Sequence, residues 1–206
     1  MAHAASRHVL TEAIWPVEGA GLWVKRAVLV VLGVAILVFC AKIKVPVWPS
    51  PVAISLGTFA VLTIGAAYGP RLGLVTMGAW MLVGALGFDV FQNSSADKYG
   101  LTYMLGATGG YLVGYMLATV ALGFAARRGW DRSVPGMALA MLAGNVLIYV
   151  PGLLWLGYLV ANGMFDPAKY ASVTDQTLAW GLTPFLIGDA IKLALAALIV
   201  PGVWKL

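Results

Sequence analysis

The chain has 206 residues, of which 61% are hydrophobic and 10% are charged, with a formal net charge of +5 at pH 7. Ordinary soluble domains carry about 25% charged residues, so this composition excludes an intrinsically disordered chain and a typical cytosolic globular domain. The positive charge would fit nucleic-acid binding in a soluble protein. Here the basic residues flank apolar runs, where they set membrane orientation, and we expect no nucleic-acid partner.

The first predicted element is a membrane span over residues 23–43, which follows an N-terminal tail of mixed polarity over residues 1–22. Lys25 and Arg26 lead into an apolar run that is short enough for a signal peptide. The run ends in Val-Phe-Cys40, which lacks the small residues of a cleavage site, and two lysines follow closely. We therefore interpret this run as a retained transmembrane helix.

Pro46, Pro49 and Pro51 exclude a regular helix after the first span, because each proline removes a backbone donor. The next segment is therefore predicted to be an extended connector. Five further spans follow, over residues 52–69, 71–88, 102–126, 134–160 and 178–204. Pro151 predicts a kink in the fifth span. The sequence thus predicts an all-α integral membrane protein, with residues 23–204 forming a single bundle of six transmembrane helices.

Both termini are predicted to lie in the cytoplasm, because basic residues concentrate on the cytoplasmic side of a membrane. The cytoplasmic side would carry Arg7, Lys25, Arg26, Arg71, Arg127, Arg128, Arg132 and Lys205. The other side would carry Lys42, Lys44, Lys98 and Lys169. The longer connections, over residues 44–51, 89–101 and 161–177, then lie outside.

Gly106, Gly110 and Gly114 are spaced four residues apart and line one face of the fourth predicted span. Small residues at this spacing let a second helix backbone approach closely. Tight packing inside the bundle is the favoured interpretation. An interface with a partner subunit, or a close approach of a ligand, is the alternative.

Asp189 and Lys192 are two ionisable residues inside the otherwise apolar sixth span, three residues apart and thus on one helix face. Ionisable residues within a membrane mark substrate or ion sites by default, although a self-satisfied ion pair that locks packing is the alternative. Asp189 is 16 residues, or about 24 Å, from Lys205 at the inner interface. A site there would lie in the outer part of the membrane.

The residues that most enzymes and metal sites need are scarce in this chain. Cys40 is the only cysteine, and His3 and His8 lie outside every predicted span, so an intrachain disulfide, a cysteine metal cluster and a histidine site within the membrane are excluded. No P-loop motif is present. Gly188-Asp189 is similar to intramembrane aspartyl proteases, but a paired carboxylate is missing. We expect no enzyme activity, no metal and no cofactor.

Five stretches resemble the BioY family, the biotin-specific substrate-capture (S) subunits of energy-coupling-factor (ECF) transporters. They occur in order and at family-like spacing between about residues 28 and 200. The stretches cover residues 45–55, 65–73, 90–93, 106–115 and 188–192. The glycine-rich motif of the fourth span and the Gly-Asp-x-x-Lys motif of the sixth are specific when they occur together.

The resemblance implies six helices, biotin capture near the outer face of a bacterial cytoplasmic membrane, and transport with a membrane coupling subunit and two ATPase subunits. It also implies that Asn93, Asp189 and Lys192 are polar contacts to biotin and that Tyr111 lies near the pocket. These roles suit the ligand, since a lysine can bind its valerate carboxylate and an Asn or Asp its ureido group. Its thioether ring needs apolar or aromatic walls.

The chain departs from the family pattern at a few positions. Gly57 replaces a usual glutamine, and Asp89 and Ala107 replace usual prolines. The first helix of the family carries small residues four positions apart that meet the coupling subunit. Here that pattern is incomplete, since Gly33 is followed four residues later by Leu37. Two other functions stay open at this point. One is a self-sufficient secondary transporter of biotin or another small carboxylate, and the other is an intramembrane enzyme that uses Asp189.

Overall fold

The computed structural model describes residues 8–19, 21–46, 48, 50, 52–95 and 98–205. Within these residues, five helical stretches are long and apolar enough to cross a membrane. They are Gly21–Lys42, Gly57–Ala85, Gly109–Arg127, Val134–Met164 and Val173–Val203. The prediction of a helical, multi-pass membrane protein is therefore confirmed.

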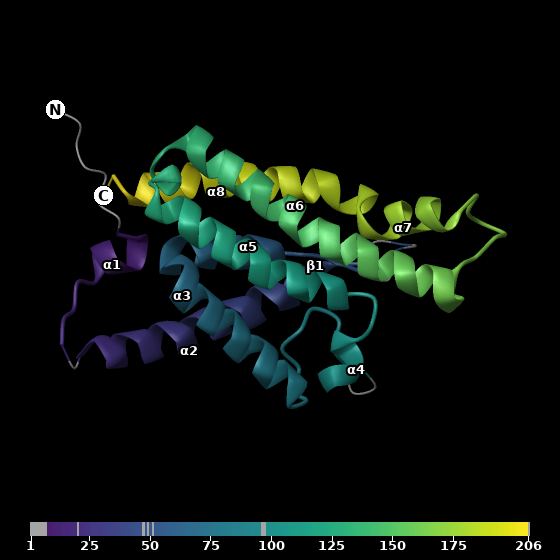
Figure 1. The fold of residues 1–206 in the computed structure, drawn as a ribbon, viewed down its shortest axis with the longest axis horizontal. Helices are drawn as coiled ribbons and strands as arrows, with labels where there is room; N and C mark the ends of the chain where they lie inside the picture. The colour runs from purple at the N-terminus through teal and green to yellow at the C-terminus, as the bar shows by residue number, and fades with distance from the viewer. Residues whose placement is uncertain are drawn as a thin grey trace.

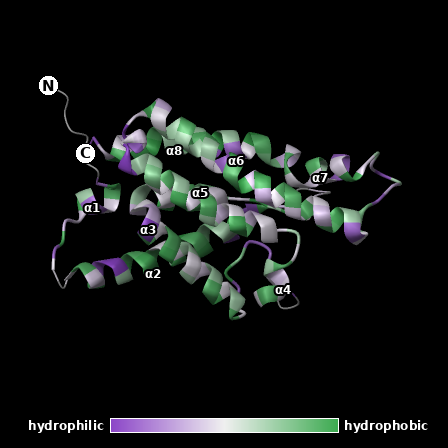
Figure 2. Cartoon of the chain, viewed as in Figure 1, coloured by the Kyte–Doolittle hydropathy of each residue, from purple (hydrophilic) through white to green (hydrophobic). Residues whose placement is uncertain are grey.

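The elements follow one another as a helical chain interrupted by one two-stranded sheet. They are α1 (Leu10–Ile14), α2 (Gly21–Lys42), β1 (Lys44–Val45), β2 (Ile54–Ser55), α3 (Gly57–Ala85), α4 (Gly100–Met104), α5 (Gly109–Arg127), the 3-10 helix η1 (Trp130–Arg132), α6 (Val134–Leu159), the π-helix η2 (Val160–Met164), α7 (Val173–Gly181), the 3-10 helix η3 (Thr183–Phe185) and α8 (Leu186–Val203). In Figure 1, α5, α6 and α8 run side by side, and α2 packs on the opposite side of α3. Hydrophobic residues dominate these helices, and hydrophilic ones gather toward helix ends and connections (Figure 2).

Helix α3 turns back on itself at Gly69, whose backbone is not helical (φ 77°, ψ 175°). A Cβ atom added to Gly73 would lie 3.6 Å from the Cα atom of Gly65. In a straight helix these two residues would be about 12 Å apart. The chain therefore reverses at Gly69–Pro70, and the two limbs of α3 correspond to the predicted spans 52–69 and 71–88 (Figure 1).

Two predicted spans have different boundaries in the structure. The fourth begins at Gly109 instead of residue 102, because the short helix α4 and a non-helical turn occupy the preceding residues. The sixth, predicted over 178–204, is interrupted between α7 and α8 at Leu182 (φ −129°, ψ −61°). Pro184 accounts for this break, because it has no N–H to donate to the carbonyl oxygen of Trp180 and its ring would clash with that carbonyl in a continuous helix; Ser50 Oγ donates to this oxygen instead. Helix α6 continues through Pro151 without a non-helical residue.

The predicted extended connector is confirmed only at its edges, since residues 47, 49 and 51 lie outside the described part of the chain. Strand β1 pairs antiparallel with β2, so that Lys44 faces Ser55 and Val45 faces Ile54. This small sheet ties the end of α2 to the beginning of α3.

The glycine-rich face of α5 packs directly against α6. A Cβ atom on Gly110 would lie 2.2 Å from the carbonyl oxygen of Pro151, and one on Gly114 would lie 2.6 Å from the Cα atom of Ile148. Gly106 precedes α5, and its carbonyl accepts a hydrogen bond from Trp155 Nε1 at 2.8 Å. These contacts favour packing inside the bundle as the purpose of the glycine pattern.

Part of the predicted N-terminal tail packs against the bundle. Val9 is fully buried, and Thr11 Oγ1 donates a hydrogen bond to the carbonyl oxygen of Ala67 at 2.9 Å. Glu12 forms an ion pair with Arg127 at 2.9 Å. Helix α1 and the end of α8 lie at the same end of the bundle (Figure 1). The division into a tail, 1–22, and one domain, 23–204, stays a prediction.

Candidate functional site

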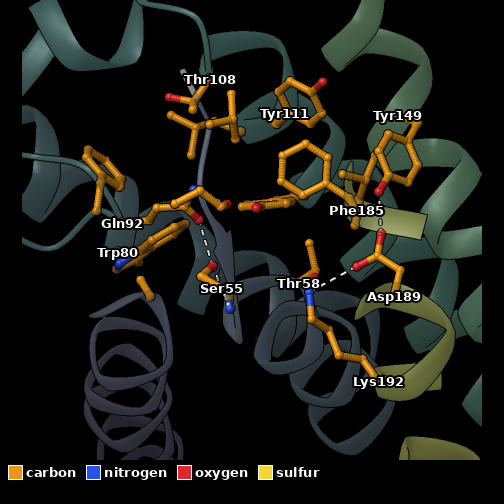
Figure 3. Close-up of a pocket in the computed structure, with 18 of the residues that line it drawn as sticks. Ser55, Thr58, Trp80, Gln92, Thr108, Tyr111, Tyr149, Phe185, Asp189 and Lys192 are labelled. Carbon is orange, nitrogen blue, oxygen red and sulfur yellow. Dashed lines mark hydrogen bonds and ion pairs between the residues drawn. The ribbon is translucent and has the colours of Figure 1, made fainter. Parts of the chain in front are cut away.

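A cavity lies between the helices, at the end of the bundle where α2 ends and α8 begins. Its empty volume is about 640 Å³, including space open to solvent. The lining residues come from the end of α2, the segment before β2, β2, α3, the connection after α3, α4, the turn before α5, α5, α6, η3 and α8. Figure 3 shows most of them.

One side of the cavity holds a buried ion pair. The ammonium of Lys192 lies 3.0 Å from Asp189 Oδ1 and donates to Thr58 Oγ1 at 2.9 Å. The hydroxyl of Tyr149 donates to the other carboxylate oxygen of Asp189. The two charged side chains are only 9% and 8% exposed. Since an ammonium carries three donors, these contacts leave Lys192 one N–H for a ligand.

The opposite side of the cavity holds an amide (Figure 3). Ser55 Oγ donates to Gln92 Oε1 at 2.6 Å and accepts from the backbone N–H of Gly57 at 3.1 Å. Gln92 Nε2 donates to the carbonyl oxygen of Ala53 at 2.6 Å. A glutamine amide has two N–H donors, so Gln92 is fixed in place and keeps a further donor.

Aromatic rings form the walls between these two polar groups. Phe91 stacks on Tyr103 with ring centroids 4.8 Å apart and meets Trp80 edge-on at 5.0 Å. Tyr111 and Tyr149 pack edge-to-face at 6.3 Å. Such surfaces suit a compact ring, because aromatic and apolar walls supply most of the contact area in small-molecule sites.

The connection that carries Phe91 and Gln92 is held by a lysine at the end of α2. Lys42 Nζ lies 2.5 Å from Asp89 Oδ1 and donates to the carbonyl oxygen of Phe91 at 2.7 Å. The hydrogen bond from Lys42, helped by one from Ser94, holds the pKa of the Asp89 carboxyl below its ordinary value. The contacts of Lys42 with Asp89 and Phe91 thus hold the connection beside the cavity.

Three of the four predicted contact residues line this cavity. Asp189 and Lys192 form the ion pair, and Tyr111 donates its hydroxyl to the carbonyl oxygen of Gly181 at 2.8 Å. Asn93 is not among the lining residues, and its Oδ1 accepts from Lys44 Nζ at 3.1 Å. Its neighbour Gln92 lines the cavity instead.

Several lining residues were missed at the level of sequence. Gln92 belongs to a stretch that resembles the BioY family, but it was not predicted as a ligand contact. Thr58 is a single hydroxyl residue that belongs to no recognisable motif. The missed polar or aromatic residues are Ser55, Thr58, Trp80, Phe91, Gln92, Tyr103, Thr108, Tyr115, Tyr149 and Phe185. Within the described ranges, no group of three or more His, Cys, Asp or Glu residues is placed to hold a metal.

The chain is thus a helical membrane bundle with a small, partly polar cavity, the kind of site that takes a small-molecule ligand. The fold is similar to a crystal structure described as the S-component for biotin from an ECF-type ABC transporter, with a TM-score of 0.71. The similarity covers 92% of this chain and 96% of that one at 20% sequence identity, and it concerns the fold alone.

Residues 8–206 match the BioY family, and the chain belongs to that family. It is 32% identical over 175 residues to the probable biotin transporter BioY of Pyrococcus horikoshii, covering 85% of this chain and 93% of the relative. It is 33% identical over 173 residues to the biotin transporter BioY of Thermotoga maritima, covering 82% and 93%. The resemblance predicted from the motifs is confirmed, and the family consists of transporters rather than enzymes.

Proposed function

We propose that the chain binds biotin in this cavity and serves as the substrate-specific subunit for biotin uptake by an ECF-type transporter. The observation that carries the proposal is the pair of separate polar groups, at Lys192 and at Gln92, joined by aromatic walls in a chain of the BioY family. Biotin has the same layout, with a carboxylate at one end, a ureido group at the other and a thioether ring near the latter.

Lys192 is the proposed partner of the biotin carboxylate. Its ammonium already binds Asp189 and Thr58, which fix its position, and its third N–H remains for the ligand. The site is shielded from water, since Lys192 and Asp189 are both buried. A charge pair in such a setting is stronger than one at a wet surface.

The ureido group is proposed to meet the amide side of the cavity. Gln92 offers an N–H donor and an oxygen that accepts from Ser55, so it matches a group with both donors and acceptors. Asn93 stays a proposed contact. It would require a rearrangement, because Lys44 binds its side-chain oxygen in this structure. Asp189 is proposed to act indirectly, by holding Lys192 in position, and Tyr111 is proposed to form part of the aromatic wall of the cavity.

The proposal includes six membrane crossings with both termini in the cytoplasm of a bacterial cell. The reversal of α3 at Gly69 supports the count, because it divides one long helical stretch into two limbs. The basic residues support the orientation. Labelling of a cysteine at Lys98, in a variant in which Cys40 is alanine, should occur from outside the cell; labelling only from inside would reverse the topology.

A membrane coupling subunit and two ATPase subunits are the proposed partners, and biotin is the transported ligand rather than a cofactor. Support comes from the likeness to an S-component and from the family. Uptake measured with and without these subunits separates this function from a self-sufficient secondary transporter, which would need neither ATP hydrolysis nor the partners.

The decisive experiment is a titration of the purified full-length chain with biotin in the absence of nucleotide. We expect saturable binding by the chain alone, because the cavity is complete within it. Desthiobiotin, which lacks the thioether bridge but keeps the ureido and carboxylate groups, serves as a matched ligand. Failure of a folded, monodisperse sample to bind biotin would refute the proposal.

A further inference from the structure

A second groove lies at the other end of the bundle. The biotin cavity is reached by the end of α2, at Ala41, whereas this groove is lined by the beginning of α2, from Leu22 to Val31. Helix α1, the reversal of α3 and the end of α5 complete it. Its empty volume is about 1410 Å³, including space open to solvent.

The rim of the groove is strongly basic. Four basic residues line it, Lys25, Arg26, Arg71 and Arg127, against one carboxylate, Glu12. Arg127 takes that carboxylate at 2.9 Å. Lys25 is buried and donates to the carbonyl oxygen of Trp15. The rim therefore has a formal charge of +3.

Arg26 and Arg71 are the two exposed cations of the rim. Among the residues that the structure describes, no carboxylate pairs with either guanidinium. Arg26 lies over the ring of Trp23 at 5.3 Å, which orients it at the level of an exposed aromatic side chain. Exposed tryptophans are typical of the membrane–water interface, so Arg26 is placed near lipid headgroups, and Arg71 lines the same groove.

The floor of the groove is apolar and continues onto the surface that faces lipid. It is formed by Leu29, Val30 and Val31 of α2 and by Leu72 and Val75 of α3. Val31 and Val75 are 68% and 57% exposed. The groove thus combines cations at the interface with an apolar track that leads one to two turns into the hydrocarbon region.

We propose that this groove binds one anionic phospholipid, with its phosphate between Arg26 and Arg71 and an acyl chain along Val31 and Val75. A guanidinium matches phosphate oxygens through paired N–H donors, and basic pockets between transmembrane helices bind anionic headgroups. A protein partner would have to supply a carboxylate for each of the two arginines and an apolar ridge for the floor of the groove. A membrane lipid carries the phosphate and the chain in one molecule and already surrounds the site.

The test uses the full-length chain in micelles that contain equal amounts of phosphatidylglycerol and phosphatidylcholine, with retained lipids counted by native mass spectrometry. Wild type should retain one phosphatidylglycerol in preference to phosphatidylcholine. Arg26→Gln and Arg71→Gln should each lower that preference about fivefold, and the double variant about thirtyfold. Arg128→Gln, an exposed arginine at the same end that does not line the groove, is the matched control and should keep the preference.

Two further arms separate the alternatives. Inorganic phosphate in excess should not displace the lipid, because the acyl chain contributes to binding. The unfolding temperature of the double variant, measured in phosphatidylcholine alone, should equal that of wild type, since both arginines are exposed. The proposal is wrong if both lipids are retained equally, if phosphate displaces the lipid, or if Arg128→Gln loses as much preference as the groove variants. It is also wrong if the double variant binds lipid normally but no longer associates with a coupling subunit, since the groove would then be a protein interface.

Discussion

One lysine–aspartate pair lines the candidate cavity and another holds the connection beside it, and the two pairs differ in burial. Lys192 and Asp189 lie on one helix and are 9% and 8% exposed, whereas Lys42 and Asp89 join α2 to a connection and are 33% and 64% exposed. Removing one partner of a buried pair costs about 3–5 kcal/mol, while an exposed pair contributes about 0–1 kcal/mol. The first pair thus supplies charge inside the cavity, and the second only helps to position a wall.

Replacement of Lys192 should have the largest effect on binding. Lys192→Ala would leave the shielded carboxylate of biotin without its partner, at a cost of about 2–5 kcal/mol. Biotin affinity should therefore fall roughly 30- to 4,000-fold, as measured by titration of the purified variant. An amidated biotin should bind wild type much more weakly than biotin does and lose little more with Lys192→Ala.

The competing interpretation is that Lys192 serves only to neutralise Asp189. In that case each single alanine variant would fold poorly, because it strands a buried charge, and the double variant would recover folding and binding. A ligand contact instead requires that the double variant bind worst of all. Equal binding of biotin and its amide by wild type would reject the assigned role.

Gln92→Ala should have the next largest effect. The change removes the amide that bonds Ser55 and Ala53 and that is proposed to meet the ureido group. Loss of one to two neutral hydrogen bonds, at about 0.5–1.5 kcal/mol each, predicts a decrease of roughly 2- to 150-fold in biotin affinity by titration. Asn93→Ala is the neighbouring control; a larger loss there than at Gln92 would favour Asn93 as the ligand contact.

Tyr111→Phe should change stability more than binding. The hydroxyl of Tyr111 is committed to the carbonyl oxygen of Gly181, so its loss removes one buried hydrogen bond, worth about 1 kcal/mol of unfolding free energy. The ring that lines the cavity remains. Thermal unfolding in detergent should show the decrease, with biotin affinity within about fivefold of wild type. A greater loss of affinity would mean that the hydroxyl contacts the ligand.

The exposed pair should give the smallest effect, and one that depends on pH. The pKa of Asp89 is lowered by the hydrogen bond from Lys42. The carboxylate of Asp89 therefore contributes fully to folding stability at a pH above the pKa that this residue has in the unfolded chain. That contribution is lost as the pH falls through the lower pKa of the folded protein. Asp89→Asn should reduce stability by about 1 kcal/mol or less at pH 7 and remove this acid-dependent loss. If Asp89→Asn instead lost several kcal/mol of unfolding free energy, the exposed pair would matter as much as the buried one, and the contrast in burial would not explain their roles.

Hydropathy was sufficient to predict the helical bundle, because each span needs about 20 apolar residues. The end of one span and the beginning of the next at Gly69–Pro70 were predictable, because a glycine followed by a proline interrupts a regular helix. The break at Leu182 was missed, since the apolar residues on both sides of Pro184 read as one continuous run. Hydrophobic periodicity reports burial and does not reveal a short irregular segment between two helices.

The cavity could be predicted only in part. Asp189 and Lys192 stand out because charge is rare in a membrane helix. Thr58 and Gln92 do not, because a hydroxyl at a helix start and an amide in a connection are ordinary in sequence. Their role arises from the pairing of β1 with β2 and from the contacts of Lys42, which join residues far apart in the chain.

The break before α8 has an electrostatic consequence for the buried pair. A continuous helix over 178–204 would have placed Asp189 in its middle, whereas α8 begins at Leu186 and has Asp189 in its first turn. The aligned peptide dipoles of a helix leave a partial positive charge of about +0.5 at its N-terminus. This macrodipole offsets part of the Asp189 charge, so the carboxylate neutralises Lys192 less completely. The cavity wall thereby keeps a positive potential that can attract an anionic ligand.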